Sequence, residues 1–192
     1  MVDRNAIVFS CDCGQIRGTI SPATSASGIH AICHCRDCRA AELHLNRKDP
    51  DPHGVELFMT TPDTVQFEQG AANLAILRLG PRGLLRWYAN CCKVPMFNTL
   101  AKSGLPFSSI HTGRLQDVSA IGPVRVEAFI PQSGGAPKHK GSAFMAWRLA
   151  VGLGSARLSG RWKQTPFFDL DTGAPTAPVH VLTKEQRAAL YT

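Results

Sequence analysis

The chain contains 192 residues, of which 44% are hydrophobic and 18% are charged. The length fits one domain or one domain with an appendage, and the hydrophobic fraction suffices for a packed core, so a disordered chain is excluded. The net charge of +7 is uneven, because residues 1–130 carry a net charge of +2 and residues 131–192 carry +5.

The sequence shows no targeting or membrane segment. Residues 1–10 lack the basic region, apolar run and cleavage site of a secretory signal. The most apolar later stretch, residues 143–153, is interrupted by Arg148 and is far shorter than the ~20 residues needed to span a bilayer. We therefore expect a cytoplasmic protein without membrane contact, whose thiols stay reduced.

Short runs with strand periodicity dominate the first two thirds of the chain. Apolar and polar residues alternate over residues 16–20 and 124–128, which predicts strands with one buried face. Gly, Pro and Asp separate further predicted strands, which cover residues 55–59, 64–67, 74–79 and 84–88. We infer a mainly β fold of small antiparallel sheets with a few short helices.

Two short helices are predicted at opposite ends of the chain. Residues 36–45 are rich in good helix formers and follow a cysteine cluster. Residues 184–190 follow Thr183, which with Gln186 has the form of a capping box.

The region after residue 130 is expected to form a C-terminal extension that contains helix. Residues 131–141 are rich in Gly, Pro and Lys and are the best candidate for a linker. A helix is predicted to begin at Ser142 as N-cap and to stop near residues 152–154. Its helical spacing predicts a packing face formed by Phe144, Trp147 and Val151. We expect residues 1–130 to form a zinc-binding domain and residues 131–192 to pack onto it.

All seven cysteines lie before residue 93, in three groups. These groups are Cys11/Cys13, Cys33/Cys35/Cys38 and Cys91/Cys92. An odd count and a reducing compartment argue against disulfides, whereas close spacing is typical of metal ligands. The alternative is that the cysteines are buried free thiols, which pack as small hydrophobic groups.

The middle group is the strongest zinc motif. In a strand, Cys33 and Cys35 share one face, and a turn can bring in Cys38. Zn²⁺ accepts such a soft, tetrahedral set at ~2.3 Å per sulfur. Three protein ligands with an open fourth position are the pattern of a catalytic zinc. His34 would point to the other face and is not expected to be a ligand.

Three motifs together carry a family resemblance. They are Cys11-Asp-Cys13-Gly14, Cys33-His34-Cys35-Arg36-Asp37-Cys38-Arg39 and Cys92-x-x-Pro95. Over residues 6–130 they resemble the glutathione-dependent formaldehyde-activating enzyme family, also called centromere protein V-like, whose pattern is C-x-C-G, C-H-C-x-x-C-R and C-x-x-C-G-x-P. The chain departs from this pattern in the third motif, where Ala89 replaces the first Cys and Lys93 replaces Gly.

The resemblance implies a β-tent fold with a structural zinc on the outer motifs and a catalytic zinc on the middle one, so one or two Zn²⁺ per chain are expected. The register set by Pro95 favours Cys92 as the partner of Cys11 and Cys13. Cys91 can supply the fourth thiolate only if the backbone bends sharply, because adjacent strand residues face opposite ways. Otherwise the outer site is degraded. We favour the four-thiolate site, in which Cys11, Cys13, Cys91 and Cys92 bind the structural zinc, because a metal best explains why two cysteine pairs are kept.

The resemblance also implies a zinc-dependent carbon–sulfur lyase-like activity on a thiol adduct of a small aldehyde. Glutathione is then the candidate co-substrate, and Arg36, Arg39 and Arg86 are candidates to bind its carboxylates. For each arginine the alternative is an ordinary ion pair. The general acid or base is not identified, since His30, His44, His53 and His111 all qualify.

A second hypothesis is a non-catalytic zinc scaffold that binds nucleic acid or a protein through its basic C-terminal part. A scaffold would close the middle site with a fourth protein ligand, whereas an enzyme would leave it open. No recognition helix with Lys or Arg at helical spacing and no aromatic stacking motif are present, so nucleic acid is not the expected partner.

Overall fold

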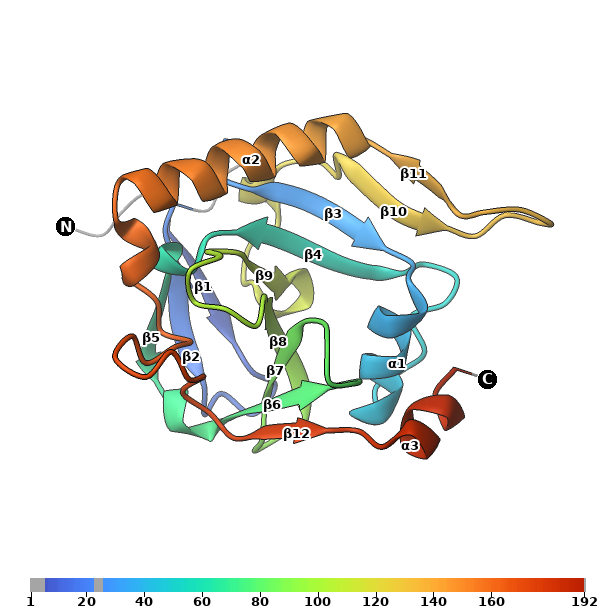
Figure 1. Cartoon of the computed structure of the whole chain (residues 1–192), viewed down its shortest axis with the longest axis horizontal. Helices are drawn as coiled ribbons and strands as arrows, with labels where there is room; N and C mark the ends of the chain where they lie inside the picture. Colours follow the sequence, from blue (N-terminus) through green and yellow to red (C-terminus); the bar gives the residue numbers. More distant parts are fainter. Residues whose placement is uncertain (1–5, 23–25, 192) are drawn as a thin grey trace.

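Two β-sheets form the body of the protein (Figure 1). The structure, a computed structural model, describes residues 6–22 and 26–191. The smaller sheet is antiparallel and has three strands, β1 (Ile7–Ser10), β2 (Arg17–Ile20) and β5 (Val65–Gln69), in the order β1-β2-β5. The mainly β prediction is confirmed at this level.

The larger sheet has nine strands in the order β11-β10-β3-β4-β9-β8-β7-β6-β12. Its strands are β3 (Ile29–Cys33), β4 (Val55–Thr60), β6 (Leu74–Arg78), β7 (Leu85–Ala89), β8 (Val94–Thr99), β9 (Ser108–His111), β10 (Val126–Ile130), β11 (Lys138–Lys140) and β12 (Val179–Val181). The pairs β10–β3 and β12–β6 are parallel. The expectation of only small antiparallel sheets is therefore wrong here, because periodicity identifies strands but not the partners that returning segments find.

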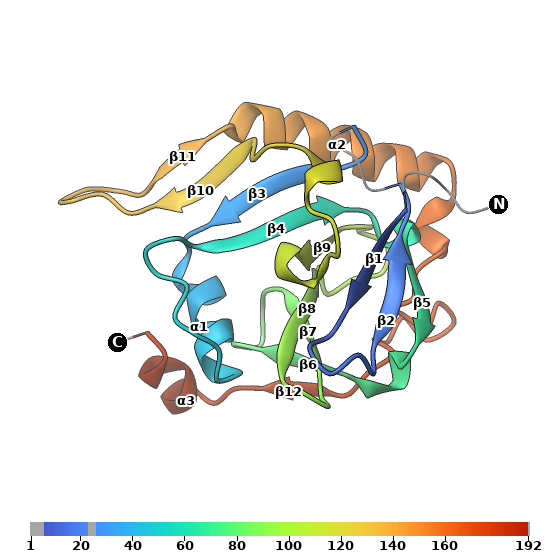
Figure 2. The same cartoon turned by 180° about the vertical axis from the view of Figure 1, so that it is seen from behind.

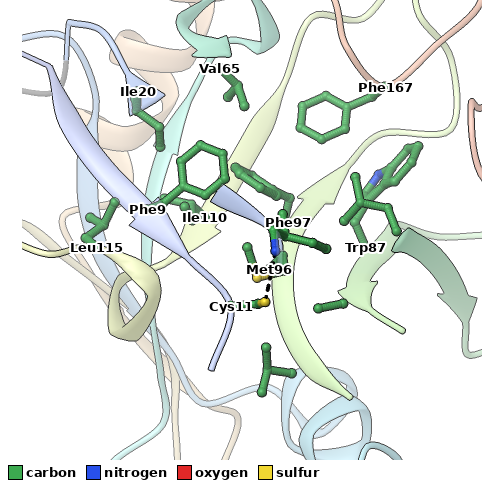
Figure 3. Packing of buried hydrophobic residues seen from close by; sticks show 14 of the residues in the cluster. Phe9, Cys11, Ile20, Val65, Trp87, Met96, Phe97, Ile110, Leu115 and Phe167 are labelled. Atoms are coloured by element: carbon green, nitrogen blue, oxygen red, sulfur yellow. Dashed lines mark hydrogen bonds between the residues drawn. The ribbon is translucent and has the colours of Figure 1, made fainter. Parts of the chain in front are cut away.

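The main core lies between the two sheets, and aromatic rings fill it (Figure 3). Phe9 from the small sheet meets Phe97 from the large sheet edge-on, with ring centroids 5.1 Å apart. Phe167, from the C-terminal region, is fully buried and lies 5.0 Å from Trp87 and 5.3 Å from Phe97. Such aromatic pairs add ~0.5–1.5 kcal/mol each beyond the area they bury.

The two short predicted helices are both present. Helix α1 (Arg36–His44) follows β3 directly, and helix α3 (Lys184–Ala189) begins with the predicted capping box of Thr183 and Gln186. In α3 the Thr183 hydroxyl accepts from the Gln186 N–H, and the Gln186 side chain accepts from the Thr183 N–H. Each cap satisfies backbone groups that the helix end leaves without partners.

The predicted linker is instead part of a hairpin. Strand β11 lies within residues 131–141 and pairs antiparallel with β10, so the two strands project together (Figure 2). The Gly and Pro residues that suggested a linker form the turn of this hairpin, because the same residues favour turns and linkers alike.

Helix α2 (Ser142–Leu158) differs from its prediction at both ends. Gly141, not Ser142, is its N-cap, and the helix continues through Gly152 and Gly154. Isolated glycines cost only about 1 kcal/mol each in a helix, so they did not end it. None of the helices in the described part of the chain is long and apolar enough to cross a bilayer.

The predicted packing face of α2 is also wrong for two of its three residues. Phe144 packs against the β3 and β10 side chains, but Trp147 is 59% exposed and Val151 is 48% exposed. Apolar residues surround this helix, so their spacing alone does not identify the buried side. The domain boundary at residue 130 stays a prediction.

Candidate metal centres

The seven thiols gather in two clusters. Within each cluster the sulfur atoms all lie within 4.8 Å of one another, and all seven cysteines are free. The first thiol cluster is Cys33, Cys35 and Cys38; the second thiol cluster is Cys11, Cys13, Cys91 and Cys92. The structure thus brings together the thiols that the sequence grouped.

The first thiol cluster is formed by a strand-to-helix junction rather than by strand alternation. Strand β3 ends at Cys33, and Cys35 is the N-cap of α1 with φ −69° and ψ 145°. The Cys38 N–H donates to the Cys35 sulfur at 3.3 Å, so the thiol serves as the capping group. The expectation that Cys33 and Cys35 share one face of a strand is therefore wrong, because Cys35 lies beyond the end of β3. The three thiols nevertheless meet as predicted. A helix N-terminus also favours a thiolate.

The three thiols share negative charge unequally. Hydrogen bonds from Cys33 and Cys38, together with the charge of Arg86, lower the pKa of Cys35. The same hydrogen bonding raises the pKa of Cys33 and that of Cys38, and burial adds to both increases. Metal ligands must be deprotonated, so a divalent cation bound by these three thiols would displace their protons.

Arg86 is the predicted arginine that touches the first thiol cluster. It is buried on β7, and its Nη1 lies 3.9 Å from the Cys38 sulfur and 3.4 Å from Oδ1 of Asn98. Asn98 in turn donates to the Ser109 hydroxyl at 3.2 Å. Sequence reasoning missed Asn98 and Ser109, which lie in β8 and β9, two strands that the sequence analysis did not predict.

The other two predicted arginines are engaged elsewhere. Arg39 donates to both oxygens of Asp49, at 2.9 Å and 2.7 Å, a fork-like ion pair of the kind that the sequence analysis gave as the alternative for each arginine. The guanidinium carbon of Arg36 lies 4.7 Å from the ring centroid of Tyr191, whose hydroxyl donates to Asp37 at 2.6 Å.

A small cavity of about 20 Å³ adjoins the first thiol cluster. Its lining residues are Cys33, His34, Cys35, Arg39, Pro50, Asp51 and Gly54. Gly54 has φ +76°, and a Cβ there would come within 2.9 Å of the His34 ring, so glycine allows this close approach. His34 Nδ1 is buried without a hydrogen-bond partner among the described residues, and the ring does not join the thiols, as expected.

The second thiol cluster joins the two sheets. Cys11 and Cys13 lie in the β1–β2 loop, and Cys91 and Cys92 lie in the β7–β8 turn. The sulfur of Cys13 is 3.5 Å from that of Cys11 and 3.3 Å from that of Cys91, while Cys91 is 3.9 Å from both Cys11 and Cys92. Four sulfurs at zinc bonding distance would lie about 3.8 Å apart, so the set is close to a tetrahedral site. Cys11 borders the core beside Met96 (Figure 3).

The sharp bend that Cys91 requires is present. The Lys93 N–H donates to the Ala89 carbonyl at 2.7 Å, and Lys93 has φ +56°, a left-handed conformation. This is the position where the family pattern has Gly, so lysine keeps the turn with some backbone strain. Ala89 stays buried in β7, and Cys91 takes the fourth corner of the cluster.

The histidines differ in what surrounds them. His30 uses both ring nitrogens, Nδ1 at 2.6 Å from the Gly122 carbonyl and Nε2 at 2.5 Å from Glu56. The His44 ring stacks on His180 at 6.3 Å. Among the histidines in the described residues, only His111 pairs through a single nitrogen with a largely buried carboxylate, that of Glu42.

Comparison with known proteins gives a family. The model of a family of unknown function, DUF6151, matches residues 4–179. The chain belongs to the DUF6151 family. No curated protein matches it. A solved structure of a Rhodobacter sphaeroides protein is similar at 16% identity and a TM-score of 0.44, over 63% of this chain and 98% of that one. This DUF6151 member therefore has two cysteine clusters that could bind metal ions such as zinc.

Proposed function

We propose that the protein binds one Zn²⁺ in each thiol cluster and that only the first zinc is open to a ligand. The observation that carries the proposal is the ligand count. The second thiol cluster offers four sulfurs, whereas no fourth His, Cys, Asp or Glu joins the first among the residues described. Four protein ligands close a structural zinc, and three leave a position free. All-sulfur sets at these spacings suit Zn²⁺ rather than Mg²⁺ or Ca²⁺.

We infer that the first centre acts on a thiol adduct of a small aldehyde, as a carbon–sulfur lyase-like site with glutathione or a similar thiol as co-substrate. The motif resemblance over residues 6–130, which also implies the β-tent fold, supports this inference. A bound Zn²⁺ would supply a position that favours the thiolate form of an incoming thiol. Cys33, Cys35 and Cys38 would hold the ion, and Arg86 would offset the negative charge of the three thiolates.

The small cavity restricts how a substrate could approach. About 20 Å³ accommodates a single small group, so a sulfur atom fits but a whole tripeptide does not. The rest of the substrate would lie outside, where Arg39 lines the opening. We propose that Arg39 contacts a carboxylate of the substrate and gives up part of its bond with Asp49 to do so. Arg36 is a candidate for the same role only if Tyr191 moves away from its guanidinium group.

Cobalt substitution tests the open position. Co²⁺ replaces Zn²⁺ in thiolate sites and its visible absorption reports the ligand set. Glutathione is expected to perturb the Co²⁺ spectrum, whereas S-methylglutathione, which has no free thiol, is not. The perturbation should persist in Cys91→Ser, which leaves the first thiol cluster intact, and disappear in Cys38→Ser. A spectrum that glutathione does not change would contradict an open position.

The scaffold hypothesis rests on a different observation. Residues 128–168 contain six Lys or Arg and no Asp or Glu, and they include β11 and the turn of the projecting β10–β11 hairpin, in which Glu127 of β10 pairs with Lys140. Such a segment suits an acidic partner. The scaffold function is favoured if zinc at the first centre does not bind thiols while the protein binds an acidic polymer with an affinity that falls steeply as the salt concentration rises.

A further inference from the structure

A second, larger pocket lies beside the segment that borders the first centre. Its volume is about 260 Å³, and Pro50 and Gly54 line both it and the small cavity. Its charged and titratable lining residues are Glu42, Arg47, Glu56, His111 and Arg114. Only His111 among them was a sequence candidate, as one of four possible general acids or bases. We call this hollow the Glu42–His111 pocket.

The end of helix α1 places Glu42 and Arg47 on the same pocket. Asn46 has φ +56°, the Arg47 N–H donates to the Glu42 carbonyl at 3.0 Å, and the Asn46 N–H donates to the Leu43 carbonyl at 3.0 Å. This is a Schellman motif with Asn at the left-handed position, which turns the chain back on the helix. Arg47 therefore returns toward the last turns of α1 instead of leading away.

A tight turn pairs the other two residues. His111 ends β9 and caps the 3₁₀ turn Thr112–Arg114. In a 3₁₀ turn, side chains three residues apart lie on the same side, so His111 and Arg114 both reach the pocket. Two separate backbone motifs thus each supply one arginine and one member of the Glu42–His111 pair.

Glu42 orients the imidazole of His111. The distance from His111 Nδ1 to Glu42 Oε1 is 3.2 Å, and the two side chains are only 15% and 13% exposed. Nε2 of His111 has no hydrogen-bond partner in the described part of the chain, in contrast to His30, whose two nitrogens are both occupied. A carboxylate on Nδ1 favours the tautomer that carries its hydrogen there, so the lone pair on Nε2 can accept a hydrogen bond.

The two arginines form a cationic end. Arg47 Nη1 lies 3.1 Å from one oxygen of Asp12, and Arg114 Nη1 contacts the other oxygen. Two guanidinium groups therefore share a single carboxylate, and each has five N–H donors, of which Asp12 takes few. The remaining donors fit a second carboxylate.

We propose that the Glu42–His111 pocket binds a small carboxylate that carries a hydroxyl group. Its carboxylate would contact Arg47 and Arg114, and its hydroxyl would face His111. His111 Nε2 would accept a hydrogen bond from that hydroxyl, while Nδ1 stays bonded to Glu42. His111 is then the residue that recognises the hydroxyl, in a site that is separate from the thiol clusters. This inference does not depend on zinc at the first centre.

Nuclear magnetic resonance of ¹⁵N-labelled histidine in the zinc-loaded protein tests the pocket with lactate as the probe. His111 is expected as the Nδ1-protonated tautomer, and lactate should shift its ring resonances saturably in the millimolar range. Methyl lactate, which lacks the carboxylate, should cause no saturable shift, and propionate, which lacks the hydroxyl, should bind more weakly than lactate. Equal binding of propionate and lactate would overturn the hydroxyl contact.

Matched variants test the arginine contact with the carboxylate and the Glu42 contact with His111 separately. Arg47→Gln should weaken lactate binding about tenfold, since a charge-assisted fork is lost, and Arg17→Gln, a half-exposed arginine on β2, should leave it unchanged. Glu42→Gln should abolish the tautomer preference of His111. If Arg47→Gln does not fold, Arg47→Lys keeps the charge but not the fork and should still weaken binding. No saturable shift with lactate, or unchanged affinity in the folded arginine variant, would overturn the proposal.

Discussion

Arg86 lies with its guanidinium 3.9 Å from the sulfur of Cys38, and both groups are buried. The two residues come from different elements, β7 and helix α1, which are 48 residues apart in sequence. A buried cation beside three thiols that would lose their protons on metal binding compensates part of the resulting charge.

Removal of this charge is expected to weaken metal binding at the first centre. Arg86→Gln should lower the zinc affinity of the first thiol cluster about tenfold, which is the lower end of the loss usually caused by mutating a residue that supports metal ligands. Arg86→Lys should lower the affinity less. Competition with a chromophoric chelator measures the affinity. Arg17→Gln is the matched control and should bind zinc as the unaltered protein does. Equal affinity in Arg86→Gln would show that the guanidinium has a packing role only.

The first thiol cluster could be predicted from local spacing, whereas the grouping of Cys11 and Cys13 with the distant Cys91 and Cys92 rested on the motif resemblance. Cys33, Cys35 and Cys38 lie within six residues, so any compact turn brings them together, and the junction of β3 with α1 achieved this differently from the strand that was expected. The position of Cys91 could not be predicted in this way, because it depends on the backbone φ angle of Lys93. The left-handed conformation of Lys93 is not visible in composition, because lysine seldom adopts it.

Contacts between distant segments could not be predicted in the same way. The Glu42–His111 pair joins residues 69 apart in sequence. Parallel pairing of β12 with β6 likewise depends on where the chain returns after residue 158. Periodicity indicates the buried face of an element with one apolar side, but it does not identify the segment that packs against that face.

Both adjacent cysteines of the β7–β8 turn are expected to be ligands. Cys91→Ser and Cys92→Ser should each lower the zinc content from about two per chain toward one, since a structural site takes four ligands. Elemental analysis of protein purified without chelator measures the content. Cys38→Ser is the matched control, since it should also lose one zinc but from the other cluster. If Cys91→Ser keeps two zincs and its thermal stability, Cys91 is not a ligand.

The left-handed residue in that turn gives a separate prediction. Lys93→Val should destabilise the protein by about 1–2 kcal/mol relative to Lys93→Gly, because a β-branched side chain is strained at positive φ and glycine is not. Chemical denaturation measures the difference. The same pair of substitutions at Lys102, outside the two thiol clusters, controls for the change of side chain alone. Equal stability of the two Lys93 variants would argue against the φ of +56° at this position.

Metal removal should loosen the contact between the two sheets. The second thiol cluster connects the β1–β2 loop with the β7–β8 turn, so a bound metal ion would act as a crosslink. A strong chelator is expected to lower the melting temperature by roughly 10 °C or more, as loss of a few kcal/mol does in a protein of this size. Zn²⁺ should restore it and Mg²⁺ should not, because thiolates select the softer ion. Unchanged melting after verified metal removal would contradict a stabilising role.

Phe167 is expected to hold the C-terminal region in the core. Its ring contacts Trp87 and Phe97 of the large sheet, and it is fully buried, whereas Trp147 on α2 is mostly exposed. Phe167→Ala should therefore cost about 3–5 kcal/mol, the usual range for a buried ring. Trp147→Ala should change the free energy of unfolding by less than about 0.5 kcal/mol.

Limited proteolysis at Gly134–Gly135 tests whether residues 131–192 belong to the same folding unit as the rest of the chain or form an independent module. If residues 131–192 form part of the same folding unit, the nicked protein should stay associated, and Phe167→Ala should unfold in one transition at a lower denaturant concentration. Two soluble pieces that separate after cleavage would show an independent module. In that case Phe167→Ala would lower the stability of one transition and leave the other unchanged, a result that the contacts of Phe167 with Trp87 and Phe97 argue against.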